Sequence, residues 1–181
     1  HLTYGPKIQD RAKRKVEADA IRQRTSTYSS TAYYIALGDF NIYGGTEEAF
    51  DTLLDRTHNG WFDDPLGLEV YPNWSTSGLT EYNTHNTRDG HGPYLGGGGG
   101  FGLDERFDLI LNSKNVLEPG GFMYKAGSYV TFGNDGLHNN RDVNEQPNNS
   151  VPVDVADALY MASDHLPVYA DYYVGVEVAA T

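Results

Sequence analysis

The chain has no cysteine, few basic residues and no long apolar run. The absence of Cys among its 181 residues excludes disulfides, thiolate zinc sites and cysteine nucleophiles. Its 13 Lys and Arg stand against 25 Asp and Glu, and the net charge of -12 argues against a protein that coats nucleic acid with a basic face. No apolar run approaches the roughly 20 residues that span a bilayer. This acidic balance does not exclude an enzyme that reaches phosphate through a bound metal, although solubility is the preferred explanation for most of the acidic residues.

What the chain does contain predicts a folded domain. Hydrophobic residues make up 39% and there are 14 tyrosines, enough for a core. The length fits one domain, covering residues 1–181. Because the sequence begins at His1 rather than Met, we expect a processed or cropped product, and an extracellular or periplasmic location is favoured over the cytosol.

A helix is predicted over residues 8–25, where apolar residues recur every four positions from Ile8 to Ala20. Seven of the 13 basic residues lie in residues 7–24 and give that segment a net charge of +4. They are interpreted either as a phosphate-facing patch or, by preference, as a solvated helix face.

The remaining periodic segments predict an α/β (α+β) fold. A buried strand over residues 31–37 ends at Gly38, and Thr46 precedes an amphipathic segment typical of a helix. Strand, turn and helix in this order favour the α/β class. The other expected elements are strands at 106–112 and 165–174 and helices at 47–56 and 154–161.

Two long loops separate these elements. Residues 60–102 carry scattered aromatic side chains that are expected to anchor the loop to the core, and they contain a glycine run at 96–100 that is predicted to be mobile. Residues 134–149 are rich in Asn and Asp, so a calcium site is a minor alternative there.

The first group of candidate functional residues is Gly38-Asp39-Phe40-Asn41, at the end of a predicted strand. Asp39 and Asn41 are two residues apart, so both side chains can point the same way while Phe40 enters the core. An aspartate accepts from water or binds a metal, and an asparagine amide donates to a phosphoryl oxygen. An Asx turn that closes the strand is the equally weighted alternative.

The second group is Asp108, inside the apolar strand at 106–112. A carboxylate there is costly unless a metal, an arginine or a histidine satisfies it. A salt bridge to Arg106 is the structural alternative.

The third group is Ser163-Asp164-His165, just before the last predicted strand. On a strand, the side chains of Asp164 and His165 would point to opposite sides and find separate partners, one of them a metal and the other a carboxylate such as Asp108. A histidine held by a carboxylate keeps one tautomer and is stabilised when charged.

Taken in order, the three groups GDFN, FDLILNS and SDHLPV resemble the endonuclease/exonuclease/phosphatase superfamily, over nearly the whole chain. His1-Leu2-Thr3 is similar to the histidine-containing strand end of that family. The resemblance implies a deoxyribonuclease I-like β-sandwich flanked by helices, present here as its C-terminal half. It also implies hydrolysis of a phosphodiester by water, with Mg²⁺ as the usual metal and Mn²⁺ or Ca²⁺ possible.

By the same resemblance, Asp39 orients or activates the water and contributes to the metal site with Asp164. Asn41 and His165 contact the phosphate, His165 also transfers a proton, and Asp108 orients His165. His1 would be a second histidine on the phosphate side. Mg²⁺ suits these candidates because oxygen donors dominate them.

The family's principal metal-binding glutamate and a further asparagine belong to an N-terminal half that is absent from these 181 residues. We therefore expect the missing half, or a second copy of the chain, to cover an apolar surface. A nuclease is the first interpretation. A phospholipid phosphodiesterase of sphingomyelinase type and a non-catalytic binding module remain the alternatives.

Overall fold

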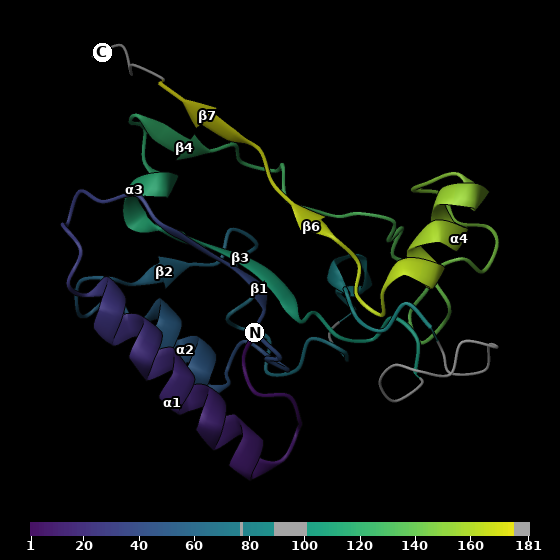
Figure 1. Cartoon of the computed structure of the whole chain (residues 1–181), viewed down its shortest axis with the longest axis horizontal. Helices are drawn as coiled ribbons and strands as arrows, with labels where there is room; N and C mark the ends of the chain where they lie inside the picture. Colours follow the sequence, from purple (N-terminus) through teal and green to yellow (C-terminus); the bar gives the residue numbers. More distant parts are fainter. Residues whose placement is uncertain (77, 89–100, 176–181) are drawn as a thin grey trace.

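The computed structural model describes residues 1–76, 78–88 and 101–175, and the glycine run at 96–100 lies outside these ranges. The fold belongs to the mixed α/β class, with helices around small antiparallel sheets (Figure 1). The helices are α1 (Ile8–Thr25), α2 (Glu48–Leu54), α3 (Lys114–Leu117), α4 (Val153–Ala162) and the short 3-10 helix η1 (Thr80–Tyr82). The strands are β1 (Ile35–Asp39), β2 (Phe62–Asp63), β3 (Asp108–Ser113), β4 (Phe122–Tyr124), β5 (Val130–Thr131), β6 (Val168–Tyr169) and β7 (Tyr172–Val174).

Three small antiparallel sheets organise the described strands. The largest has the order β1-β3-β2, so β3 is central and β1 forms an edge. The other two are the pairs β4-β7 and β5-β6. Pairing of β1 with β3 sets Ile35 opposite Asn112 and continues to the Asp39–Asp108 pair at the other end.

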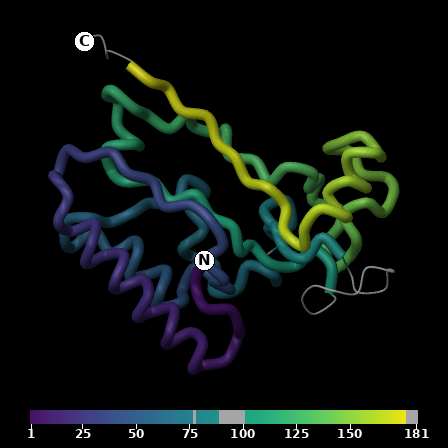
Figure 2. Tube along the Cα trace, viewed as in Figure 1, coloured from purple at the N-terminus to yellow at the C-terminus, as the bar shows by residue number. Residues whose placement is uncertain are grey.

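The main core lies between the β1-β3-β2 sheet and the helices α1 and α2, which run side by side along it (Figure 1). Phe50 and Leu53 of α2 and Leu109 and Leu111 of β3 are fully buried there, because both elements turn their apolar residues to the same interior. A second, smaller cluster forms at the α4 end of the molecule, built from Leu103, Val143, Tyr160 and Leu166. Figure 2 shows the chain passing between these two regions, with α1 and α4 far apart.

Helix α1 has the predicted bounds but packs through a different face from the expected one. Ile8 and Val16 of the apolar stripe are 84% and 67% exposed. The face turned to the core carries Ala18 and the fully buried Arg14, whose Nε donates to Glu47 Oε1 at 2.5 Å. Arginine is tolerated inside because each nitrogen of its guanidinium donates a hydrogen bond, and periodicity alone does not reveal that pairing.

Two of the basic residues of α1 bond to other parts of the fold. Arg14 is buried, and Arg22 donates to the backbone oxygens of Thr52 and Asp55, which lie at the end of α2 and just after it. These two arginines fix α1 to its neighbours, while the remaining basic side chains of the helix lie on the exposed or partly exposed surface.

Strand bounds differ from expectation more than helix bounds. The first strand starts and ends later than predicted and includes Gly38, and the second runs from 108 to 113 rather than from 106 to 112. The expected strand at 165–174 is two short strands, because β6 pairs with β5 while β7 pairs with β4. Helices α2 and α4 confirm the expected helices at 47–56 and 154–161 to within two residues at each end.

Aromatic residues anchor the long loop after α2, as predicted. Trp74 and Phe62 are 1% and 2% exposed and belong to the main core, and the Trp74 indole donates to Leu68 O at 3.0 Å. Across the described ranges, no helix has both the length and the apolar character that a membrane span requires.

Candidate active site

The register of the β1-β3 pair brings two distant carboxylates together. Asp39 is the Cα partner of Asp108, although 69 positions separate them in sequence. Both residues lie at the same end of the sheet because the strands are antiparallel and β1 ends where β3 begins. The two motifs therefore meet at one end of this sheet, as the sequence predicted.

His165 completes this group through Asp108. Its Nδ1 lies 2.7 Å from Asp108 Oδ2, and the backbone N–H of Asp108 donates to Thr84 Oγ1. Arg106, the alternative partner, instead forms a buried pair with Asp64 at 2.8 Å. The predicted pairing of Asp108 with His165 is confirmed, and Asp108 lies behind the imidazole rather than lining the pocket.

Asp39 and Asn41 point the same way, with Phe40 buried between them at 5% exposure. The backbone N–H of Asn41 donates to Asp39 Oδ1 at 2.8 Å, and its Nδ2 donates to Asp39 Oδ2 at 2.9 Å and to Leu2 O at 3.2 Å. This is an Asx turn, which Asn41 closes with a φ of 50°, a left-handed conformation that asparagine tolerates. Both amide hydrogens already have acceptors, so Asn41 fixes Asp39 in this arrangement.

His1 also reaches the site. Its Nε2 lies 3.1 Å from Asp39 Oδ2, and its side chain is 68% exposed. The backbone N–H of Leu2 donates to Asp39 O at 3.0 Å, which aligns this segment with the end of β1. His1 therefore lies at the solvent side of the pocket.

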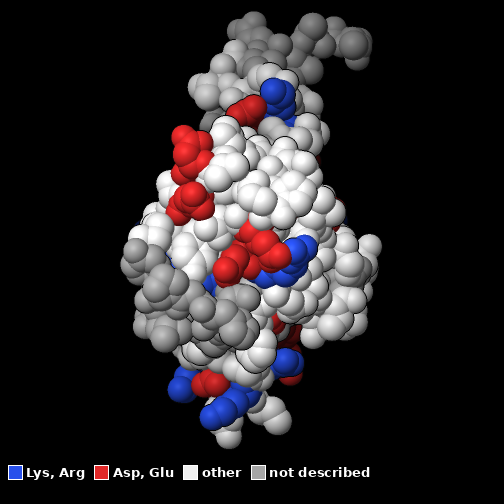
Figure 3. Space-filling view, turned by 90° about the vertical axis from the view of Figure 1, so that its right-hand side faces the viewer, with Lys and Arg blue, Asp and Glu red and all other residues white. Residues whose placement is uncertain are grey.

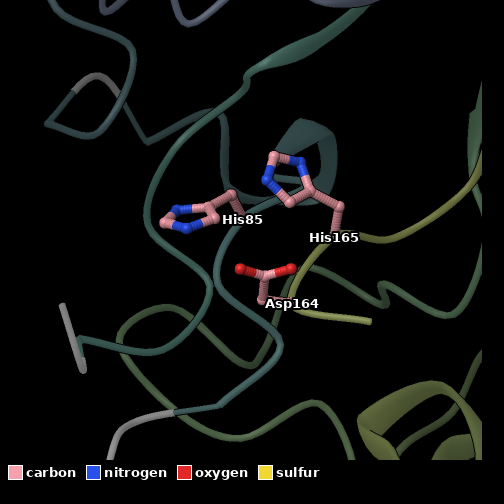
Figure 4. A group of neighbouring side chains, drawn as sticks. All are labelled: His85, Asp164 and His165. Carbon is pink, nitrogen blue, oxygen red and sulfur yellow. The ribbon is translucent and has the colours of Figure 1, made fainter. Parts of the chain in front are cut away.

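Asp164 and His165 do not point to opposite sides, and that expectation was wrong. Asp164 lies at a bend and His165 forms an isolated bridge with His85, so these residues are not a continuous strand and strand alternation does not apply. Their ligand atoms, with one from His85, all lie within 4.8 Å of one another. Figure 4 shows the carboxylate and the two imidazoles turned toward a shared space.

His85 is the site residue that sequence reasoning missed. It is 8% exposed. The centroid of its ring lies 4.8 Å from that of His165 and 5.0 Å from that of Phe107, and the ring is tilted relative to both. Its loop follows η1 and has no periodicity, so a lone histidine there carried no signal in the sequence. Backbone pairing of His85 with both Glu105 and His165 brings it to the site.

These groups surround a pocket of about 230 Å³. It contains five of the six residues predicted for the site, and it lies where the main core meets the smaller α4 cluster. Its walls are formed by His1, Tyr4, Asp39, Asn41, His85, Phe107, Asp164 and His165.

Burial and charge set the pKa values of the three central groups. Burial raises the pKa of Asp39, and the hydrogen bond from the Asn41 backbone opposes that shift. Burial alone would lower the pKa of His165, but the hydrogen bond and charge of Asp108, with the charges of Asp39 and Asp164, outweigh it and raise the value. Burial, reinforced by the charge of His165, lowers the pKa of His85 to about 4. The site thus holds one histidine inclined to be charged beside one that stays neutral.

Within the described residues, the group formed by His85, Asp164 and His165 is the candidate metal cluster, and Asp39 is not part of it. In the Asn-rich loop, the carboxylate of Asp135 is bonded within the loop. It lies 2.8 Å from His138 Nδ1 and accepts hydrogen bonds from the backbone N–H groups of Leu137 and Asn149. That pattern builds a turn and leaves the calcium interpretation without support.

Neither a family model, nor a curated protein, nor a solved structure matches this chain. Function therefore has to be argued from the geometry of the pocket.

Proposed function

We propose that this chain is the C-terminal half of a metal-dependent phosphoesterase domain that hydrolyses a phosphodiester by water attack, with a nuclease as the first candidate. The observation that carries the proposal is the meeting of three separate motifs at one pocket, with Asp39 opposite Asp108 and His165 bonded to Asp108. Convergence of this kind favours a catalytic site over a binding module, because a binding surface does not require the carboxylate–histidine pair.

Asp39 is the proposed base for the attacking water. Two hydrogen bonds from Asn41 hold its carboxylate in place, and its raised pKa makes it a better proton acceptor than an exposed aspartate. As the water oxygen bonds to phosphorus, its proton passes to Asp39.

His165 is the proposed phosphate contact. Its hydrogen bond to Asp108 fixes the ring, and its raised pKa favours the charged form that donates to a phosphoryl oxygen and gives a proton to the leaving oxygen. His1 lies at the mouth of the same pocket, in a place where a second phosphate contact can form.

A divalent ion, Mg²⁺ by the family resemblance with Mn²⁺ or Ca²⁺ as alternatives, would supply positive charge beside the phosphate and lower the pKa of a bound water. Asp164 fits the role of ligand, because its carboxylate lies in the candidate metal cluster and accepts no hydrogen bond from the residues that the structure describes. Carboxylate oxygen is the donor that these ions prefer.

The finer fold proposal is that the β1-β3-β2 sheet is part of a deoxyribonuclease I-like sandwich. The support for it is the outer side of β1. Leu37 is 71% exposed there, and none of the described strands pairs with β1 on that side. An N-terminal half of that sandwich, or a second copy of the chain, is proposed to cover it.

A phospholipid phosphodiesterase is the second candidate, because the surface is a poor match for a polyanion. The net charge is -12, and acidic and basic side chains are interspersed over the face that carries α4, with separate rather than continuous basic areas among its described residues (Figure 3). A zwitterionic headgroup is less repelled by such a surface than a nucleic acid is.

Hydrolysis of DNA, RNA, sphingomyelin and phosphoinositides, each with Mg²⁺, Mn²⁺ or Ca²⁺, tests the proposal on the 181-residue chain and on any longer natural form of it. Replacing Asp39 by Asn should lower kcat by about 100-fold or more, because the proposed base is lost. Asp171→Asn is the matched control and should leave kcat unchanged. Its exposed carboxylate pairs with Lys125, just after β4, and does not line the pocket. Absence of hydrolysis in every form, or full activity in Asp39→Asn, would contradict the proposal.

A further inference from the structure

His85, Asp164 and His165 are held together by the backbone rather than by chance contact of mobile side chains. The Leu166 N–H donates to Thr84 O at 2.8 Å, and the Thr87 N–H donates to Asp164 O at 3.0 Å. These bonds join the segment around His85 to the bend that carries Asp164 and His165, so the three side chains keep their neighbourhood (Figure 4).

Two of the three side chains have polar atoms without partners. Nδ1 of His85 is buried and bonds to none of the described residues, and its whole side chain is 8% exposed. The partly exposed carboxylate of Asp164 accepts no hydrogen bond from that part of the chain either. Buried polar groups usually find partners, so a neutral imidazole left facing a carboxylate indicates that a ligand belongs between them.

His165 has the arrangement expected of a metal ligand. Its Nδ1 is bonded to Asp108 at 2.7 Å, which leaves the lone pair of Nε2 available. Metal-binding histidines commonly donate their other ring N–H to a carboxylate, which orients the ring and increases its basicity.

We propose that His85, Asp164 and His165 form a site for a divalent first-row transition metal, with two imidazole nitrogens and one carboxylate oxygen as ligands. In a tetrahedral site with bonds of roughly 2.1 Å, two ligand atoms lie about 3.4 Å apart. The ligand atoms of the three side chains lie within 4.8 Å of one another. An approach of at most about 1.4 Å therefore brings them to bonding positions around one ion. Three protein ligands leave positions open for water and a phosphate oxygen.

The nitrogen donors decide the metal class. Imidazole suits zinc, copper, iron and nickel, whereas Mg²⁺, Ca²⁺ and Mn²⁺ prefer oxygen ligands. The expectation of Mg²⁺ was based on a candidate set without His85, so adding that residue changes the preference. The part that this metal would play in catalysis rests on the proposed function. The metal site also changes the role proposed for His165, because its Nε2 cannot donate a proton while it binds a metal.

Titration of the chelator-treated chain with Co²⁺ tests the site, because the visible absorption of this ion reports its ligands. We expect one Co²⁺ to bind and an excess of Mg²⁺ not to displace it. His85→Ala should weaken Co²⁺ binding at least tenfold, whereas His58→Ala should leave it unchanged because His58 is an exposed histidine beside Asp55. Circular dichroism checks that each variant is folded, and Asp164→Asn gives a second variant at a partly exposed position.

Equal Co²⁺ affinity in wild type and in both site variants would overturn the inference, as would displacement by equimolar Mg²⁺. The two proposals fail separately. Co²⁺ binding without hydrolysis of any substrate leaves the metal site intact and removes the phosphoesterase. Mg²⁺-dependent hydrolysis by a chain that does not bind Co²⁺ removes only the transition-metal site.

Discussion

The carboxylate of Asp108 lies in a largely apolar strand and is satisfied by the imidazole of His165, whose Nδ1 lies 2.7 Å from Asp108 Oδ2. An aspartate in an apolar strand needs a partner, and its partner was among the few candidates that the sequence offered. His85 could not be found this way, because a polar residue in a loop is under no such constraint in the sequence. The direction of the Asp164 side chain depended on whether this residue lies in a strand or at a bend, and tertiary pairing decides that.

Glu105 is a second buried carboxyl group, outside the pocket lining. Its Oε2 is buried without a hydrogen-bond partner among the described residues, and burial, followed by the charge of Asp104, raises its pKa to about 8. Because the folded pKa lies above the ordinary value near 4.5, the folded state holds a proton that the unfolded state has released between these two pH values. This contribution to stability is complete below about pH 4.5 and is lost as the pH rises to about 8.

We therefore predict that Glu105→Gln becomes increasingly stabilising, relative to the wild type, from pH 5 to 8. The difference should grow by at most about 1.4 kcal/mol per pH unit, the limit for one proton. Urea unfolding of both proteins at several pH values measures it, and the opposite contribution of His85, whose pKa is lowered to about 4, cancels in the comparison. For Glu118→Gln, at an exposed position beside Lys114, the difference in unfolding free energy from the wild type should not change with pH. The same pH-independent difference for Glu105→Gln would show that Glu105 is ionised in the folded chain.

At the level of elements, helices were predicted better than strands. The bounds of α1 follow from sequence alone, since a helix is a local structure of 18 consecutive residues. The strands are two to six residues long and depend on pairing with distant segments, so their ends are set by partners that the sequence does not reveal. The exposed face of α1 was wrongly assigned for a related reason, because Arg14 is buried by a partner that lies 33 positions away.

The Arg14–Glu47 pair joins α1 to the start of α2, and its side chains are 0% and 4% exposed. Removing one partner leaves a buried charge, so Glu47→Ala should lower the free energy of unfolding by about 3–5 kcal/mol. The double variant Arg14→Met/Glu47→Leu should recover most of that loss, because two apolar side chains of similar size remove both charges. Lys15→Ala, which breaks the exposed Lys15–Asp19 pair, should cost less than about 1 kcal/mol.

Chemical denaturation of the four proteins measures these differences in one experiment. A loss in Glu47→Ala no greater than that in Lys15→Ala would mean that water reaches the pair. A double variant as unstable as the single one would mean that the hydrogen bonds from Arg14 to Thr3 O and Gly5 O, both at 2.8 Å, matter more than the ion pair.

For the whole molecule, the unpaired edge of β1 determines how the chain can associate with another chain. β1 is an edge strand, and Leu37 at its middle is 71% exposed. A groove of about 350 Å³ follows this edge and is lined on the α1 side by Ile21. A second groove of about 470 Å³ continues past Tyr34 and Phe62. An unpaired strand edge beside an apolar groove is a template for another strand.

We predict that the 181-residue chain self-associates through β1, with a second copy covering the edge. Light scattering with size-exclusion chromatography should give a mass that rises with protein concentration, and Leu37→Lys should restore the monomer because a charge on an edge strand opposes pairing. Val70→Lys is the matched control, since Val70 is also 71% exposed but lies in a loop. A monomer at every concentration would contradict the prediction. If Val70→Lys disrupted association equally, general surface hydrophobicity rather than the β1 edge would be responsible.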